Sequence, residues 1–109
     1  MTWAAVCPLD GLLPDRGVAA MVAGRQVALF RTSPDDALYA ISNHDPFSGA
    51  NVLSRGIVGS RRDVPKVASP MYKQSFDLRT GVCLDDASVT VPVFPVRVVD
   101  GVVQVQVPG

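Results

Sequence analysis

The sequence predicts an all-β fold of short antiparallel sheets, and three observations favour this class. Hydrophobic residues make up 48% of the 109 residues but aromatic residues only 6%, so Val, Ala and Leu must supply the core. Val is β-branched and suits a pleated sheet. Short Val-rich runs alternate with turn sequences that contain Gly, Pro or Asp, and no window of eleven residues shows a helical stripe. A chain of this length supports one core, so we expect a single domain over residues 1–109.

The N-terminal half predicts an edge strand followed by a three-stranded meander. Pro8 ends the first run, which is why we place that run at a sheet edge. Gly24 lies between two β-like runs and predicts a hairpin turn. The expected elements are residues 3–6 as a strand, 9–13 as a loop or single helical turn, 18–22 and 26–31 as a hairpin, and 38–41 as a third strand after a polar turn at 32–36.

The C-terminal half predicts shorter strands and one strong hairpin. Residues 49–59 hold three glycines among scattered apolar residues, a pattern that favours a compact loop with one or two short strands over a helix. Pro65 confines a strand over 64–68 to the edge of a sheet or to its own end. Short strands follow at 76–78 and 82–84. Asp100-Gly101 joins the Val-rich runs 96–99 and 102–107 and predicts a tight hairpin.

Two proline-containing turns, residues 43–50 and 69–73, stand out from this strand pattern. Each follows a short β-like run and carries a proline directly after a small polar residue, so we expect two loops that face each other. The positions best placed to hold a ligand are Asp45, Phe47, Ser69 and Tyr72. These side chains are poor ligands for a soft metal ion.

Composition and charge exclude several classes of partner. Ten basic residues balance ten acidic residues, so net charge provides no attraction to nucleic acid. The apolar runs are far shorter than the ~20 residues of a membrane-spanning helix, and the N-terminus lacks the features of a secretory leader. We therefore expect a cytoplasmic protein that contacts neither nucleic acid nor membrane.

The remaining chemically active side chains predict no reaction centre. We expect Cys7 and Cys83 to be reduced, mostly buried thiols, with a disulfide or a shared metal as alternatives. His44 beside its turn is expected to be solvated or locally bonded, although a lone histidine could also carry protons. Asp85 and Asp86 supply too few oxygens for a calcium loop. We assign no catalytic, metal-binding or cofactor-binding residue to this chain.

The order of these parts resembles a Rieske-type domain, with a meander, a first loop, a glycine-rich connection, a second loop and a closing hairpin. In that family Cys-x-His in the first loop and Cys-x-x-His in the second hold a [2Fe-2S] cluster. Here Asp45-Pro46-Phe47 and Ser69-Pro70-Met71-Tyr72 occupy the corresponding places. The resemblance thus implies the fold, together with the loss of all four cluster ligands.

Within this group, five strings resemble the small subunit of bacterial assimilatory NADH-dependent nitrite reductase. They are residues 45–50, 54–59, 67–74, 76–78 and 83–86. This resemblance implies a partner, the large subunit, that carries FAD, a [4Fe-4S] cluster and sirohaem and reduces nitrite to ammonium with NADH during nitrate assimilation. The small subunit is then an auxiliary, non-redox component that docks on the large subunit.

The same loops supply candidate docking residues, because an apolar centre with a basic rim is typical of protein interfaces. We expect Asp45 to cap a turn, Phe47 and Tyr72 to pack between the loops, and Ser69 to bond across them. The docking candidates are Phe47, Arg55, Arg61, Arg62, Lys66, Met71, Tyr72 and Lys73. Two alternatives remain: an electron carrier with an unusual iron site at Asp45 and Tyr72, and a stand-alone interaction module on a Rieske scaffold.

Overall fold

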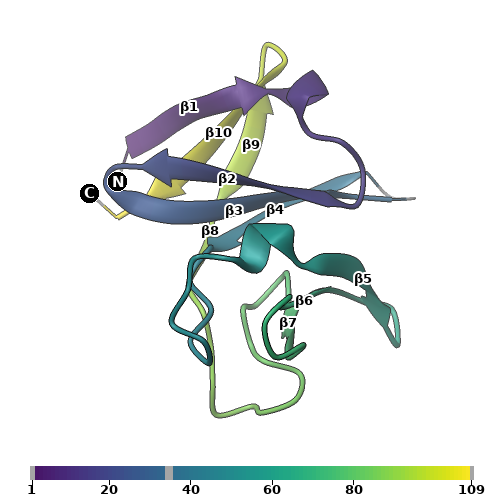
Figure 1. Cartoon of the computed structure of the whole chain (residues 1–109). Coiled ribbons are helices and arrows are strands. Elements are labelled where there is room, and N and C mark those ends of the chain that lie inside the picture. The colour runs from purple at the N-terminus through teal and green to yellow at the C-terminus, as the bar shows by residue number, and fades with distance from the viewer. Residues whose placement is uncertain (1, 34–35, 109) are drawn as a thin grey trace.

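The computed structural model describes residues 2–33 and 36–108, which form three antiparallel sheets (Figure 1). The first sheet has the strand order β1-β10-β9, the second β2-β3-β4-β8 and the third β5-β6-β7. The strands are β1 (Thr2–Pro8), β2 (Arg16–Val22), β3 (Arg25–Thr32), β4 (Ala37–Ser42), β5 (Ile57–Arg61), β6 (Val64–Ala68), β7 (Ser75–Asp77), β8 (Val93–Phe94), β9 (Val96–Val99) and β10 (Val102–Val107). Two single 3-10 turns, η1 (Leu9–Gly11) and η2 (Leu53–Arg55), complete the described elements. The predicted all-β class is confirmed.

The second sheet forms the middle layer, and β3 is buried on both of its faces. Its residues 27–30 form a continuous apolar run, which is typical of a strand covered on both sides. Val27 and Leu29 point into one core cluster, whereas Ala28 and Phe30 point into another. This alternation follows from the two-residue period of a strand.

The first core cluster lies between the middle layer and the β1-β10-β9 sheet. Alternate residues of β10, namely Val103, Val105 and Val107, are buried there, while the glutamines between them are half-buried on the other face. The predicted hairpin of β9 and β10 is confirmed. Its turn residues Asp100 and Gly101 have φ values of 51° and 77°, as a type I′ turn requires.

The second core cluster joins the middle layer to the β5-β6-β7 sheet and to the two loops, which form the lower part of Figure 1. Phe30 of β3 and Phe76 of β7 are both fully buried in it. Burying a side chain of this size stabilises a fold by roughly 1.5 to 3 kcal/mol. The cluster therefore fixes the loops against a rigid sheet.

The structure decides between the two alternatives for Pro65 and corrects the prediction for residues 49–59. Strand β6 lies in the centre of its sheet, although Pro65 led us to consider an edge. Pro65 is tolerated because it is the second residue of the strand, and its carbonyl oxygen still accepts a 2.9 Å hydrogen bond from the Leu78 N–H. The stretch 49–59 contains the start of β5 as predicted, but also the 3-10 turn η2, which we did not expect.

The predicted strand over 82–84 is wrong, because Val82 and Cys83 form only one isolated bridge each, to Thr90 and Phe76, which is too short a ladder for a strand. The remaining predicted strands agree with the structure within one or two residues at their ends. Strand β1 is an edge strand, η1 forms the expected single turn, and β2, β3 and β4 form the meander. Residues 34–35 of the predicted polar turn lie outside the described residues. No helix in the described ranges has the length and apolar character needed to cross a bilayer.

Candidate functional site: two facing loops

The first loop begins where β4 ends and is held by buried Asn43. The Asn43 side-chain oxygen accepts a 2.7 Å hydrogen bond from the Ser54 N–H, and its amide nitrogen donates to the Asn51 carbonyl at 3.2 Å. The Asp45 N–H donates to the Ala50 carbonyl at 2.8 Å, which closes the loop on itself. These bonds prevent the loop from relaxing independently of η2.

Asp45 is fully buried at the point where the two loops meet. One carboxylate oxygen accepts a 2.9 Å bond from the Phe47 N–H, as predicted for a turn-capping aspartate. The other accepts a 2.5 Å bond from the Ser69 hydroxyl of the second loop. Burial raises the pKa of Asp45, but hydrogen bonds from Ser69, Phe47 and Ser48 outweigh it and leave the pKa lowered. The buried group is therefore a carboxylate.

The second loop is a tight turn organised by Ser69. The Ser69 N–H donates to the Gln74 carbonyl at 2.9 Å, and the Lys73 N–H donates to the Ser69 carbonyl at 3.0 Å. The Ser69 hydroxyl accepts a 3.2 Å bond from the Met71 N–H while it donates to Asp45. The predicted bond across the facing loops is thus present.

The two aromatic residues of the loops behave differently from each other. Phe47 is half-buried, packs against the second core cluster, and has its ring centroid 6.2 Å from that of Phe76 at an angle of 49°. Tyr72 is 61% exposed, so the expectation that its ring packs between the loops is wrong. The Tyr72 side chain instead faces solvent in the turn at 69–74, while Phe47 and the Asp45–Ser69 bond lie inside.

The donor atoms at the four predicted ligand positions are few. Both carboxylate oxygens of Asp45 are engaged, Ser69 donates its only hydroxyl proton to Asp45, and the Phe47 ring has no donor atom. Over the described part of the chain, no three His, Cys, Asp or Glu side chains gather closely enough to hold a metal ion.

The other reactive side chains lie outside the loop contact. Cys7 and Cys83 are free thiols, as predicted. Cys83 is buried in the second cluster, while half-buried Cys7 has a pKa raised by burial. His44 is exposed at the base of the first loop, where its backbone bridges to Asn51.

The basic docking candidates fall into two groups. Arg55, Arg62 and Lys73 are exposed. Arg61 pairs with Asp85 at 3.3 Å, and half-buried Lys66 donates to the Ser75 hydroxyl at 3.2 Å. Lys66 is therefore held against its own sheet and is less available to a partner than the exposed basic residues.

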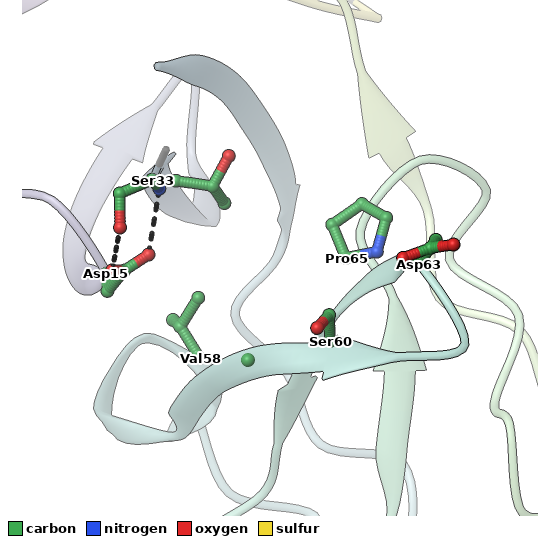
Figure 2. Close-up of a pocket in the computed structure, with 8 residues that line it drawn as sticks. Asp15, Ser33, Val58, Ser60, Asp63 and Pro65 are labelled. Atoms are coloured by element: carbon green, nitrogen blue, oxygen red, sulfur yellow. Dashed lines mark hydrogen bonds between the residues drawn. The ribbon is translucent and has the colours of Figure 1, made fainter. Parts of the chain in front are cut away.

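Sequence reasoning missed three features near this site. Asp85 accepts a 2.7 Å bond from the Ser75 N–H and so holds the start of β7. Ile57 is 76% exposed, the largest exposed fraction among the large hydrophobic residues of the described chain. A cleft of about 370 Å³ lies beside β5, with Asp15 and Ser33 on one wall and Val58 and Ser60 on the other (Figure 2). The two walls of the cleft come from segments far apart in the chain that meet only in the tertiary structure, so no sequence motif signals them.

Comparison with known proteins agrees with this architecture. Residues 2–106 match the family described as the Rieske-like [2Fe-2S] domain. The solved structure of the E. coli protein NirD superposes with a TM-score of 0.87 at 43% identity, covering 95% of this chain and 94% of that one.

Two relatives show to which group within this family the chain belongs. The nitrite reductase (NADH) small subunit of Salmonella typhimurium is 45% identical over 104 residues, which cover 95% of this chain and 96% of the relative. The nitrite reductase [NAD(P)H] large subunit of Klebsiella oxytoca contains a stretch 44% identical over 103 residues, equal to 94% of this chain and 11% of that protein. The chain therefore belongs to the Rieske-like [2Fe-2S] domain family, and within it to the small subunits of NADH-dependent nitrite reductase.

Proposed function

We propose that this chain is a non-redox subunit that docks on the large catalytic subunit of nitrite reductase and carries no cluster of its own. The observation that carries the proposal is the Asp45–Ser69 hydrogen bond, which joins the two loops where a Rieske domain would hold its cluster. The chain then contributes binding surface, and the chemistry belongs to the partner.

The donor chemistry of the loops does not fit a [2Fe-2S] cluster of the Rieske type. Such a cluster takes two thiolates on one iron and two imidazoles on the other. The corresponding positions hold Asp45, Phe47, Ser69 and Tyr72, and neither cysteine nor His44 occupies any of them. Displacing the Ser69 hydroxyl from Asp45 would also leave a buried carboxylate with fewer partners, which is costly.

The relatives support the large subunit as the partner. In Klebsiella oxytoca a stretch similar to this chain lies within a large-subunit polypeptide. Two units joined in one protein in one organism are expected to associate where they are separate chains. On this proposal FAD, the [4Fe-4S] cluster and sirohaem reside on the large subunit, which reduces nitrite to ammonium with NADH in the cytoplasm.

The docking surface that we propose is the loop face, defined by Phe47, Arg55, Met71, Tyr72 and Lys73. Met71 and Tyr72 are 53% and 61% exposed at the tip of the second loop, where two large apolar groups face solvent. Lys73 is an exposed basic residue that directly follows them in the chain. Arg55 is also exposed and precedes Gly56, whose backbone lies against the Ala68 carbonyl just before the second loop. An aromatic and apolar centre beside positive charge is the composition of many interface cores.

The proposal is tested by co-purifying the tagged chain with the large subunit and measuring affinity for two matched variants. Met71→Ser should weaken the complex at least tenfold, because it removes an anchor of the loop face. Met21→Ser is the control, since Met21 is 63% exposed on β2 in a different sheet and should not change affinity. Equal affinities for both variants would contradict the loop face, and failure of the large subunit to bind would contradict the function.

The absence of a cluster is tested separately on the purified chain. Iron and inorganic sulfide should be far below one equivalent per polypeptide, and the dithionite-reduced protein should show no rhombic EPR signal. Iron and sulfide in proportion to polypeptide would instead establish the electron-carrier alternative.

A further inference from the structure

We propose that the open edge of β5 receives an extended segment of the large subunit, which adds to the β5-β6-β7 sheet as a fourth strand. This inference rests on the proposed function for the identity of its partner. It assigns a second contact, distinct from the side chains of the loop face, in which backbone hydrogen bonds provide the binding.

The hydrogen-bond pattern shows which backbone groups of β5 face the open edge. The Leu78 N–H bonds the Pro65 carbonyl, and the Ser69 N–H bonds the Gln74 carbonyl, so residues 65, 67 and 69 direct their backbone groups away from β5. Backbone groups of successive residues point to opposite sides of a strand, so residues 64, 66 and 68 of β6 form the hydrogen bonds to β5. Their partners in β5 are residues 61, 59 and 57.

Val58 and Ser60 are therefore the β5 residues whose N–H and C=O groups point outward. In the sheet as described, β5 pairs on one side only. Across the described residues, no hydrogen bond to the backbone of Val58 or Ser60 is present beyond its own sheet. An unprotected edge of this kind is a template for strand addition.

The cleft of Figure 2 provides space for the side chains of such a strand. Val58, Ser60 and Pro65 line it from the hairpin of β5 and β6, opposite Asp15 and Ser33. The charged residues that line it in the described chain are Asp15 and Asp63, both acidic. Asp15 accepts bonds from the Ser33 N–H and hydroxyl, whereas Asp63 is exposed on the β5–β6 turn.

The opposite face of the same strand offers an apolar contact. Ile57 is 76% exposed there, and Gly59, two residues on, has no side chain and open space around it. Ile57 follows Arg55 of the loop face by two residues and pairs with Ala68, directly before the second loop, so this face of β5 begins beside the loop face. A segment with an apolar residue beside Ile57 and a Lys or Arg directed toward the acidic cleft would match both sides.

The test measures amide hydrogen exchange of the wild-type chain, alone and in its complex with the large subunit. The Val58 and Ser60 amides should exchange freely in the isolated chain and become at least tenfold slower in the complex. A complex that forms while both amides stay unprotected would overturn the strand-addition site and leave the proposed function intact. If no complex forms, both proposals fail.

Two variants test the same edge by affinity. Ser60→Pro removes an outward N–H without breaking the β5–β6 ladder and should weaken binding about tenfold. Asp63→Asn removes a charge from the cleft and should weaken binding a few-fold, with a smaller salt dependence. If Ser60→Pro does not fold, hydrogen exchange of the wild-type chain still tests whether a strand adds to β5.

Val98→Pro provides the matched control. The Gln106 N–H bonds the Pro95 carbonyl, so alternation places the Val98 N–H on the outer edge of β9, another open strand edge. This variant should bind within twofold of the wild type, and an equal loss in both proline variants would contradict a site at β5. Concentration-dependent dimers of the isolated chain with protected Val58 and Ser60 amides would show that the occupant is a second copy.

Discussion

The hydroxyl of Ser69 donates a 2.5 Å hydrogen bond to the buried carboxylate of Asp45, which lies twenty-four residues earlier in the chain. This bond links the two loops directly. A charge-assisted hydrogen bond in a buried site is stronger than a neutral bond at the surface. The relative position of the loops therefore depends on this pair.

Ser69→Ala should lower the free energy of unfolding by about 1 to 3 kcal/mol, because a buried carboxylate oxygen loses its donor. Chemical denaturation at pH 7 measures the change. Ser88→Ala is the matched control, since Ser88 donates a 2.6 Å bond to Asp86 at an exposed site and should cost less than about 0.5 kcal/mol. Equal losses would show that burial adds nothing to the Asp45–Ser69 bond.

Lowering the pH should reduce the free energy of unfolding, because Asp45 becomes protonated. Its pKa is lowered in the folded chain, against about 3.9 in an unfolded chain. The stabilisation is therefore fully present above pH 3.9 and is lost as pH falls through the folded value. Asp45→Asn should be less stable than wild type at pH 7, and the difference should shrink toward pH 2 to 3 in thermal unfolding. A constant difference across this range would contradict the lowered pKa.

Phe47→Ala should cost about 1.5 to 3 kcal/mol, less than the 3 to 5 kcal/mol expected for a fully buried ring. The ring is half-buried and contacts Phe76, so its removal leaves a gap that water can partly fill. Tyr72→Ala is the comparison within the same site and should cost less than about 1 kcal/mol, since Tyr72 is 61% exposed. Urea denaturation of both variants checks the order, and a larger loss at Tyr72 would contradict the structure.

Gly81→Ala and Gly24→Ala separate backbone strain from crowding. The two glycines have nearly equal φ values of 80° and 78°, so the conformational cost of Ala, about 1 to 2 kcal/mol, is similar. A Cβ at Gly81 would collide with the Val91 carbonyl oxygen, whereas one at Gly24 meets nothing within 4 Å. We expect Gly81→Ala to cost at least about 3 kcal/mol, or to prevent folding, and Gly24→Ala to remain near the conformational cost alone. Thermal unfolding of the two variants makes the comparison, and similar values would show that the chain relaxes around Gly81.

Local patterns were sufficient to predict most of the fold. Asp100-Gly101 between two Val-rich runs specified the last hairpin, because left-handed residues at both turn positions match the twist of paired strands. The runs 18–22 and 26–31 on either side of Gly24 predicted a hairpin, and the structure has β2 and β3 there. The position of Pro65 was ambiguous, because a proline is allowed both at an edge and near the end of a central strand.

The candidate site could be predicted only in part. The two loop sequences placed Asp45 and Ser69 in facing turns, and the chemistry of Asp before Pro predicted a turn-capping bond, whose donor in the structure is the Phe47 N–H. Tyr72 was misjudged because the direction of a side chain in a tight turn depends on which groups already fill the space behind it. Ile57 and the cleft at β5 carried no local signal.

The sequence by itself determined the strand pattern, the turns and the residue types at the loop positions, because these depend on interactions between near neighbours in the chain. Only the tertiary structure decided that the Asp45 carboxylate is buried against Ser69, that Phe47 packs while Tyr72 faces solvent, and that β5 has an open edge. These properties depend on which segments far apart in the chain cover one another, and burial and strand order exist only once the sheets have packed.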